Sequence, residues 1–137
     1  MSTISTPSHV AFYGTLMSAF HWLDELQARH LLGLVGPCTI RGRLFDMGEW
    51  PTLVLGGGTV HGELFEVLDE RVFERLDPFE DYDPADPCAS SYTRVAVALL
   101  TPAVRAWLYV ANGPVPAERH IPSGSWHALL GERADTG

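Results

Sequence analysis

Short apolar runs that stop at glycine or proline recur along this chain, and they favour strands over long helices. Such runs are typical of β-strands bounded by turns. The sequence has 13 glycines and 10 prolines to provide the turns. The expected strands cover residues 9–14, 38–45, 52–55, 59–68, 92–100 and 104–111.

The glycine run Gly56, Gly57 and Gly58 separates two of these strands. Only glycine adopts positive φ freely, so we predict a hairpin turn there. The segment 46–51 breaks the chain between the preceding pair of strands, and 81–91 reads as an irregular loop. Strands that follow one another in this way pair in antiparallel fashion.

Helical spacing is found in two places. Four residues between 23 and 31 share one helical face, and Gly33 is expected to close that helix. A second helix begins near Asp69 and should end just before Pro78, because proline does not suit a helix interior. Residues 126–130 indicate a short helical turn followed by a polar tail.

These elements predict a small α+β fold, with a mixed, mostly antiparallel sheet of about six strands curled into a partial barrel and two flanking helices. The length of 137 residues suits one domain. We expect that domain to span 9–131, with a flexible N-terminus at 1–8 and a flexible tail at 132–137.

The charge balance excludes several functions. The formal net charge is −8, and all nine basic residues are arginine. Schiff-base catalysis and phosphate binding by a P-loop both need a lysine side chain, so the absence of lysine excludes them. Nucleic acids and anionic membrane surfaces are bound by clustered positive charge, so an acidic chain with scattered arginines is not expected to bind either. No membrane span or signal peptide is visible, and two distant cysteines suggest no disulfide scaffold, so we expect a cytoplasmic protein.

No cofactor or metal motif is found. The six histidines form no zinc pattern, and the acidic stretch from 77 to 86 lacks the spacing of a calcium loop, so a solvated loop is the simpler interpretation. The glycine run is no dinucleotide fingerprint. We therefore predict no metal and no cofactor.

Glu80 is the remaining candidate. It directly follows Phe79 at the end of an amphipathic helix. A glutamate beside bulky apolar groups is desolvated, which raises its pKa toward neutrality. Composition alone would still favour an ordinary surface glutamate.

Five stretches in order together resemble the γ-glutamylcyclotransferase-like family, between about residues 10 and 130. They are YGTL at 13–16, GRLFDMG at 42–48 with Trp50-Pro51, VHGELFEV at 60–67, LDPFEDY at 76–82 with Tyr92-x-Arg94, and AWxY at 106–109 with IPSGxW at 121–126.

The resemblance implies a small mixed barrel with flanking helices, no cofactor and a reaction that releases 5-oxoproline and a free amine from a γ-glutamyl amine, a γ-glutamyl amino acid or a γ-glutamyl-capped metabolite. The catalytic glutamate of the family corresponds to Glu80. The loop that binds the glutamyl group corresponds to Tyr13, Gly14, Thr15 and Leu16.

Three further residues are expected near the substrate. Arg94 would pair with a carboxylate, either of the substrate or of a structural aspartate. Tyr109 would line the pocket or belong to the core. Trp50 stands where a tyrosine is common in the family, and the loops 17–20 and 81–91 also depart from it.

These residues fit an intramolecular reaction, in which the α-amine attacks the γ-carbonyl of the same molecule. Glu80 would serve as general acid and base, and backbone N–H groups of residues 13–16 would bind a carboxylate or the oxyanion. The alternative is a binding module on the same fold, without chemistry. The expected partner is a small γ-glutamyl molecule. The sequence is also compatible with a homodimer.

Overall fold

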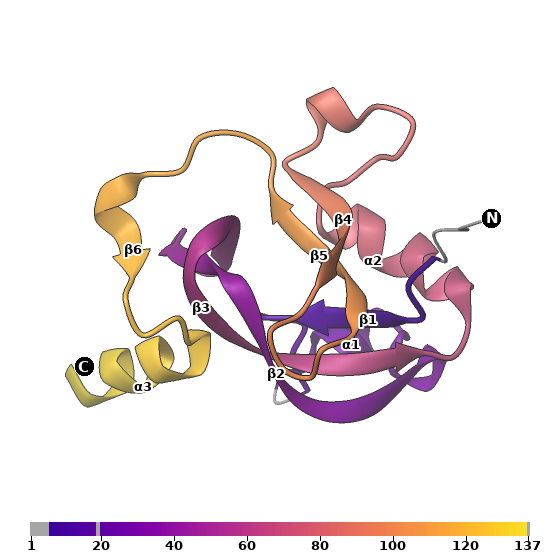
Figure 1. Ribbon diagram of the computed structural model, residues 1–137, viewed down its shortest axis with the longest axis horizontal. Coiled ribbons are helices and arrows are strands. Elements are labelled where there is room, and N and C mark those ends of the chain that lie inside the picture. The colour runs from indigo at the N-terminus through magenta and orange to yellow at the C-terminus, as the bar shows by residue number, and fades with distance from the viewer. Residues whose placement is uncertain (1–5, 19, 137) are drawn as a thin grey trace.

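The computed structural model describes residues 6–18 and 20–136 of the chain. Within them, six strands form one sheet in the order β4-β5-β1-β3-β2-β6 (Figure 1). Their bounds are β1 His9–Phe12, β2 Leu32–Asp46, β3 Pro51–Val67, β4 Tyr92–Ala98, β5 Arg105–Ala111 and β6 His120–Ile121.

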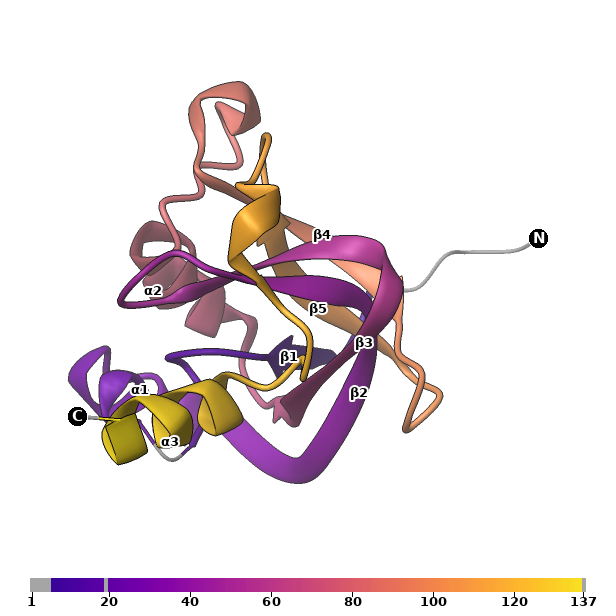
Figure 2. The same cartoon turned by 90° about the vertical axis from the view of Figure 1, so that its left-hand side faces the viewer.

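The pairing of the strands confirms the mixed, mostly antiparallel sheet. Only β1 and β5 run parallel, with Val10 opposite Trp107, while the other neighbouring pairs are antiparallel. The long hairpin of β2 and β3 bends strongly, as Figure 2 shows, and carries the sheet around on itself. Because β4 and β6 remain its two edges, the sheet curls like a barrel without closing.

The prediction of a hairpin turn at Gly56–Gly58 is wrong. These glycines lie inside β3, where the pairing with β2 shifts: Gly42 lies opposite Leu55, and Arg41 lies opposite Thr59. The run is thus a bulge in one continuous strand. Gly56 and Gly57 both have φ of +85°, and this bulge uses the positive φ of glycine just as a turn would. The hairpin turn lies instead at 46–51, the break before Pro51.

The first two helices also differ from their predicted limits. Helix α1 covers only Trp22–Glu25, because Gln27 adopts a left-handed φ of 54° and a 3₁₀ turn, η1 Arg29–Leu31, leads into β2. Gly33 therefore lies in a strand and closes no helix. Helix α2 covers Phe73–Phe79 after the 3₁₀ turn η2 Glu70–Val72, so Pro78 lies within its last turn rather than after it.

The third helix is longer than expected. Helix α3 covers Trp126–Thr136, so residues 132–136, predicted to be a flexible tail, are helical. Its first residue, Trp126, is 1% exposed and anchors the helix in the core. In Figure 1, α3 lies apart from α2, with the curved sheet between them. Further 3₁₀ turns are η3 Pro87–Ala89 and η4 Ala117–Arg119.

Strand β1 runs through the middle of the core. Val10, Ala11 and Phe12 are almost inaccessible to solvent, and they pack with residues of the neighbouring strands such as Leu64 and Leu108. Burial of such side chains is the main stabilising contribution to a fold of this kind. The residues that follow β1 are consequently held in a fixed place. No helix in the described part of the chain is long and apolar enough to cross a membrane.

Candidate functional site

A pocket of about 560 Å³ opens where β1 ends. Its walls come from segments far apart in the sequence, which the sheet brings together. They are the turn 13–16 after β1, the hairpin tip 47–51 between β2 and β3, residues 79–81 at the end of α2, the start of β4 with Ser91 and Tyr92, and the end of β5 with Tyr109 and residues 111–115.

Glu80 lies in this pocket at the C-terminus of α2. Its backbone N–H donates a 3.0 Å hydrogen bond to the carbonyl of Leu76, so the last turn of the helix fixes its position. Burial of the carboxyl group raises the pKa of Glu80 to about 7, and the negative charge of Asp77 contributes in the same direction. A carboxyl group with this pKa can both accept and donate a proton near neutral pH.

Asp77 is buried one helical turn before Glu80 and is fully engaged by its neighbours. Its Oδ1 accepts hydrogen bonds from the hydroxyl of Tyr109 at 2.6 Å and from Nε of Arg94 at 3.0 Å. The Arg94 guanidinium is packed between two rings, 4.1 Å from the centroid of Phe73 and 4.5 Å from that of Trp107. These contacts hold the Asp77 carboxylate in place one helical turn before Glu80.

The turn that follows β1 forms the opposite wall. A Cβ atom at Gly14 would lie 2.7 Å from Cγ of Pro51, so glycine allows the turn and the hairpin to approach each other closely. Within the described chain, the N–H groups of Gly14, Thr15 and Leu16 donate no hydrogen bond to the protein. Because these residues line the pocket, their N–H groups are suited to bind an anion there.

Both ends of this turn are held in place. The hydroxyl of Tyr13 donates a 2.7 Å hydrogen bond to the carbonyl of Tyr109. Its pKa is raised well above the usual value by burial and, second, by the charge of Glu80, so the phenol and the Glu80 carboxyl group interact electrostatically. At the other end, the N–H and hydroxyl of Ser18 donate to the two carboxylate oxygens of Glu63, at 2.5 and 2.7 Å.

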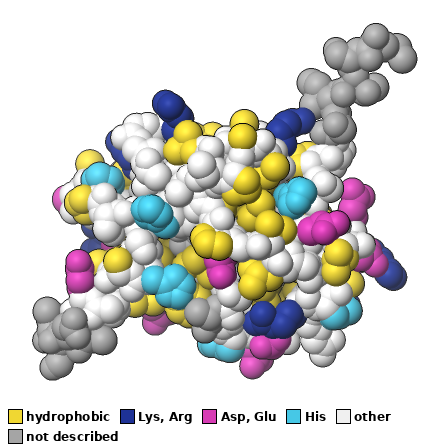
Figure 3. Space-filling model, turned by 60° about the horizontal axis from the view of Figure 1, so that its bottom comes forward, with side chains coloured by type: hydrophobic (Ala, Val, Ile, Leu, Met, Phe, Trp, Pro, Cys, Tyr) yellow, Lys and Arg dark blue, Asp and Glu magenta, His cyan; other side chains and the backbone are white. Residues whose placement is uncertain are grey.

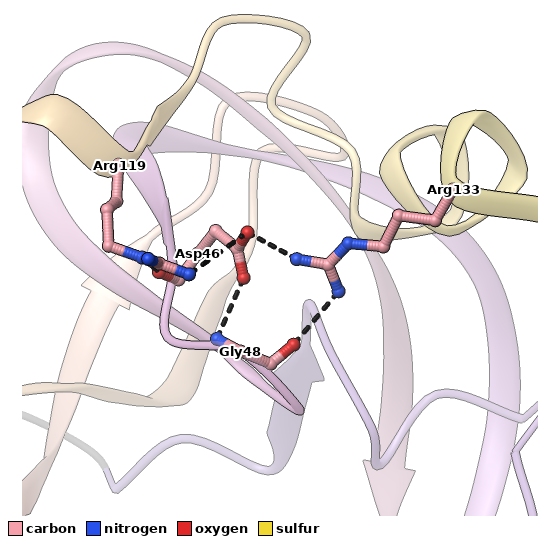
Figure 4. A network of polar contacts seen from close by, with 4 residues as sticks. All are labelled: Asp46, Gly48, Arg119 and Arg133. Carbon is pink, nitrogen blue, oxygen red and sulfur yellow. Dashed lines mark hydrogen bonds and ion pairs between the residues drawn. The ribbon is translucent and has the colours of Figure 1, made fainter. Parts of the chain in front are cut away.

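The hairpin tip is held by arginines from the C-terminal part of the chain (Figure 4). Arg133 of α3 donates to the carboxylate of Asp46 and, at 2.9 Å, to the carbonyl of Gly48. Arg119 donates to the carbonyl of Asp46. Although partial burial opposes it, the hydrogen bond from Arg133 lowers the pKa of Asp46. The tip, which bears Trp50, is thus fixed as a rim of the pocket.

The structure brings together all but one of the residues expected at the site. Glu80, Tyr13, Gly14, Thr15, Leu16, Trp50 and Tyr109 all line the pocket. Arg94 does not line it, because Asp77 takes up its guanidinium. Arg94 was expected to pair either with a substrate carboxylate or with a structural aspartate, and in the structure it pairs with Asp77.

Three residues with evident roles could not be singled out from the sequence. Asp77 belongs to the acidic stretch that reads as a solvated loop, yet it is only 7% exposed. Tyr92 lines the pocket and donates to the carbonyl of Pro51 at 3.2 Å; its place in the Tyr92-x-Arg94 motif was the available signal. Trp22 lines the pocket from α1, and the sequence carries no signal for that.

No group of three or more histidine, cysteine or acidic side chains suited to a metal ion occurs in the described part of the chain. Figure 3 shows histidines spread over one face rather than gathered at one point.

Fold and site together define a small α+β protein whose curved sheet holds a pocket with a carboxyl group of raised pKa. The sequence matches the family described as gamma-glutamyl cyclotransferase, AIG2-like, over residues 10–128. The chain belongs to this family.

Individual relatives agree with this assignment. The gamma-glutamylcyclotransferase family protein YtfP of Escherichia coli (strain K12) is 32% identical over 107 residues, which are 77% of this chain and 81% of YtfP. The protein of the same name in Citrobacter rodentium is 33% identical over 118 residues, 83% of this chain and 90% of its own length. An uncharacterized protein from Pyrococcus horikoshii has the same fold, with a TM-score of 0.68, 23% identity and coverage of 93% of this chain and 96% of its own.

Proposed function

We propose that this protein is a cyclotransferase that converts γ-glutamyl amides into 5-oxoproline and a free amine. The observation that carries the proposal is the presence, in one pocket, of Glu80 with its raised pKa and of the unpaired N–H groups of the turn at 14–16. Membership of the gamma-glutamyl cyclotransferase, AIG2-like family supports it.

The substrate contains both reacting groups, so the enzyme has to hold it bent and move two protons, one after the other, from the α-nitrogen to the leaving nitrogen. Ionised Glu80 accepts a proton from the α-ammonium group, and the freed amine attacks the γ-carbonyl carbon. A C–N bond closes the five-membered ring, and the carbonyl oxygen becomes an oxyanion. Backbone N–H groups directed at that oxygen stabilise the intermediate, and effective molarities of roughly 10⁵–10⁸ M are available to such ring closures.

Collapse of the intermediate completes the balance of atoms. Protonated Glu80 returns the proton to the nitrogen of the leaving amine, and the original C–N amide bond breaks. Glu80, ionised again, takes the second proton from the ring nitrogen and passes it to the released amine, so that a neutral lactam nitrogen and an ammonium ion result. The products 5-oxoproline and the protonated amine are then released. No water molecule is consumed. The same carboxyl group acts first as base and then as acid, which requires a pKa near the working pH.

The test is to incubate the protein with a panel of γ-glutamyl amines and γ-glutamyl amino acids and to measure 5-oxoproline. We expect turnover of part of the panel and, in Glu80→Gln, a loss of about 10²–10⁴-fold in kcat with substrate binding retained. A panel that binds but yields no 5-oxoproline with the unaltered protein would instead support a binding module. Full activity in Glu80→Gln would refute the role given to Glu80.

A further inference from the structure

The mouth of the pocket is lined by large apolar side chains that remain open to solvent. Trp22 is 36% exposed, Met47 39% and Trp50 49%, and all three line the pocket. They come from two separate segments, α1 and the hairpin tip. Phe79, next to Glu80, adds a third segment, because its ring packs against that of Trp22 with centroids 5.2 Å apart. Exposed apolar groups gathered around a pocket indicate that an apolar ligand covers them.

The charged side chains that line this pocket are all acidic. Glu49, Glu80 and Asp81 line it, and no arginine or histidine of the described chain does. Arg94 is held by Asp77 outside the lining, and the guanidinium of Arg133 is taken up by Asp46 and Gly48 behind the hairpin tip. Such a mouth favours a cation and repels a carboxylate.

The proposed reaction decides which part of the substrate meets this mouth. If the glutamyl group binds at the turn 14–16, the group attached to its γ-carbonyl extends past Glu80 toward the solvent. Phe79 directly precedes Glu80, and Trp50 directly precedes Pro51, which packs on Gly14. In that pose the leaving amine would pass between the segments that carry Phe79 and Trp50, both of which line the pocket.

We propose that the amine released is an arylalkylamine that carries no carboxylate. This inference rests on the proposed function and names its substrate class. An aromatic ring on the leaving group would pack against Trp22 and Trp50, as rings prefer to do in offset or edge arrangements. The released amine takes up a proton and leaves as a cation past Glu49 and Asp81, whereas a carboxylate beside it would be repelled.

Three substrates that differ by one group each provide the test. They are γ-glutamylphenethylamine, γ-glutamylphenylalanine, which adds a carboxylate, and γ-glutamylmethylamine, which lacks the ring. From the energy of one ring contact we expect kcat/KM for the phenethylamine to exceed that for the methylamine by about tenfold. Repulsion by the acidic mouth should place the phenylalanine compound below the phenethylamine by about tenfold as well.

Variants assign each preference to its residues. Trp50→Ala and Trp22→Ala should reduce the ratio of kcat/KM between phenethylamine and methylamine toward one. Glu49→Gln should reduce the ratio between phenethylamine and phenylalanine. The control is Leu34→Ala, since Leu34 is exposed on β2, away from the pocket, and both ratios should stay as in the unaltered protein.

Calorimetric binding of the same compounds to Glu80→Gln separates this inference from the proposed function. Tighter binding of the phenethylamine, with no 5-oxoproline formed by the unaltered protein, would refute the reaction and sustain the subsite. Turnover of all three compounds with equal kcat/KM would sustain the reaction and overturn the subsite. Absence of both binding and turnover would overturn both.

Discussion

The hydroxyl group of Tyr109 donates a hydrogen bond of 2.6 Å to Oδ1 of Asp77. Asp77 comes one helical turn before Glu80, and its charge is the second cause, after burial, of the raised pKa of Glu80. Arg94 pairs with the same carboxylate. Tyr109 and Arg94 therefore hold the charge of Asp77 in place, and this charge contributes to the raised pKa of Glu80, the proposed catalytic group.

The first prediction concerns the pH dependence of the reaction. Glu80 has to be ionised to accept the proton, and its pKa is about 7, so kcat/KM should fall as the pH decreases below that value. The measurement is the rate of 5-oxoproline formation between about pH 4 and 9, a range that covers both the usual and the raised pKa of a glutamate. An acidic limb centred at the usual glutamate value of 4.5 would contradict the raised pKa.

Replacement of Asp77 should shift the acidic limb of the pH profile of kcat/KM to lower pH. Asp77→Asn removes a negative charge beside Glu80 and leaves Arg94 uncompensated, and both changes lower the pKa of Glu80. The midpoint of the acidic limb should shift to lower pH, an effect that mere loosening of the fold would not produce. Asp69→Asn is the matched control, because Asp69 pairs with Arg71 away from the pocket; its profile should coincide with that of the unaltered protein.

The stability of the folded protein should depend on Glu80 in the opposite sense to a salt-bridged carboxylate. The folded pKa of about 7 lies above the usual value of 4.5, so the folded state binds the proton more tightly than the unfolded chain. The stabilising contribution is complete below pH 4.5 and is lost as the pH rises through 7. The difference corresponds to about 3 kcal/mol.

Urea unfolding of the unaltered protein and of Glu80→Gln at several pH values measures this contribution. The free energy of unfolding of the unaltered protein should decrease relative to that of the variant across this interval. Two curves that run parallel would show that Glu80 titrates alike in the folded and unfolded states.

Gly14→Ala tests the close approach of the turn to the hairpin. The added Cβ would meet Pro51 at 2.7 Å, so one of the two walls has to move, at a cost of about 1–3 kcal/mol in stability and with loss of activity. Gly131→Ala is the control. Gly131 has open space around its Cβ position and lies within α3, so alanine there should raise the melting temperature slightly.

The ion pair of Arg94 and Asp77 should contribute far more than a surface pair. Their side chains are 16% and 11% exposed, and removal of one partner from a buried pair costs about 3–5 kcal/mol. Arg94→Ala should lower the free energy of unfolding by an amount of that order. Arg71→Ala breaks a pair in which the arginine side chain is 76% exposed, and the expected loss is below about 1 kcal/mol; equal effects of the two substitutions would contradict this account.

The features that sequence reasoning predicted well depend on local signals. The turn after β1 follows from an apolar run stopped by glycine. The place of Glu80 directly after α2 follows from the amphipathic face of that helix, although the helix runs through Pro78 to Phe79 instead of ending before the proline. The expected number of strands is right only because two errors cancel. Residues 52–55 and 59–68 are one strand, β3, and the two-residue strand β6 was not expected.

The features that it missed depend on contacts between distant segments. Nothing near Gly56 in the sequence distinguishes a bulge from a turn, because the difference lies in the pairing with β2. The partner of Arg94 is 17 residues away in sequence, and the hydroxyl that bonds the buried Asp77 of α2 comes from Tyr109 of β5, 32 residues further along the chain. The length of α3 could not be predicted either, because Arg133 near the end of this helix is held by Asp46, which lies 87 residues earlier in the chain.

The hydrogen bond from Tyr13 to the carbonyl of Tyr109 spans 96 positions of the chain. During synthesis the turn that follows β1 emerges early, yet its phenol has no acceptor until β5 has also left the ribosome. Contacts of such long range slow folding relative to local ones. This wall of the pocket is therefore completed only after β5 has been made, and binding of a ligand there would serve as a direct reporter of when a newly made molecule has joined these two distant segments.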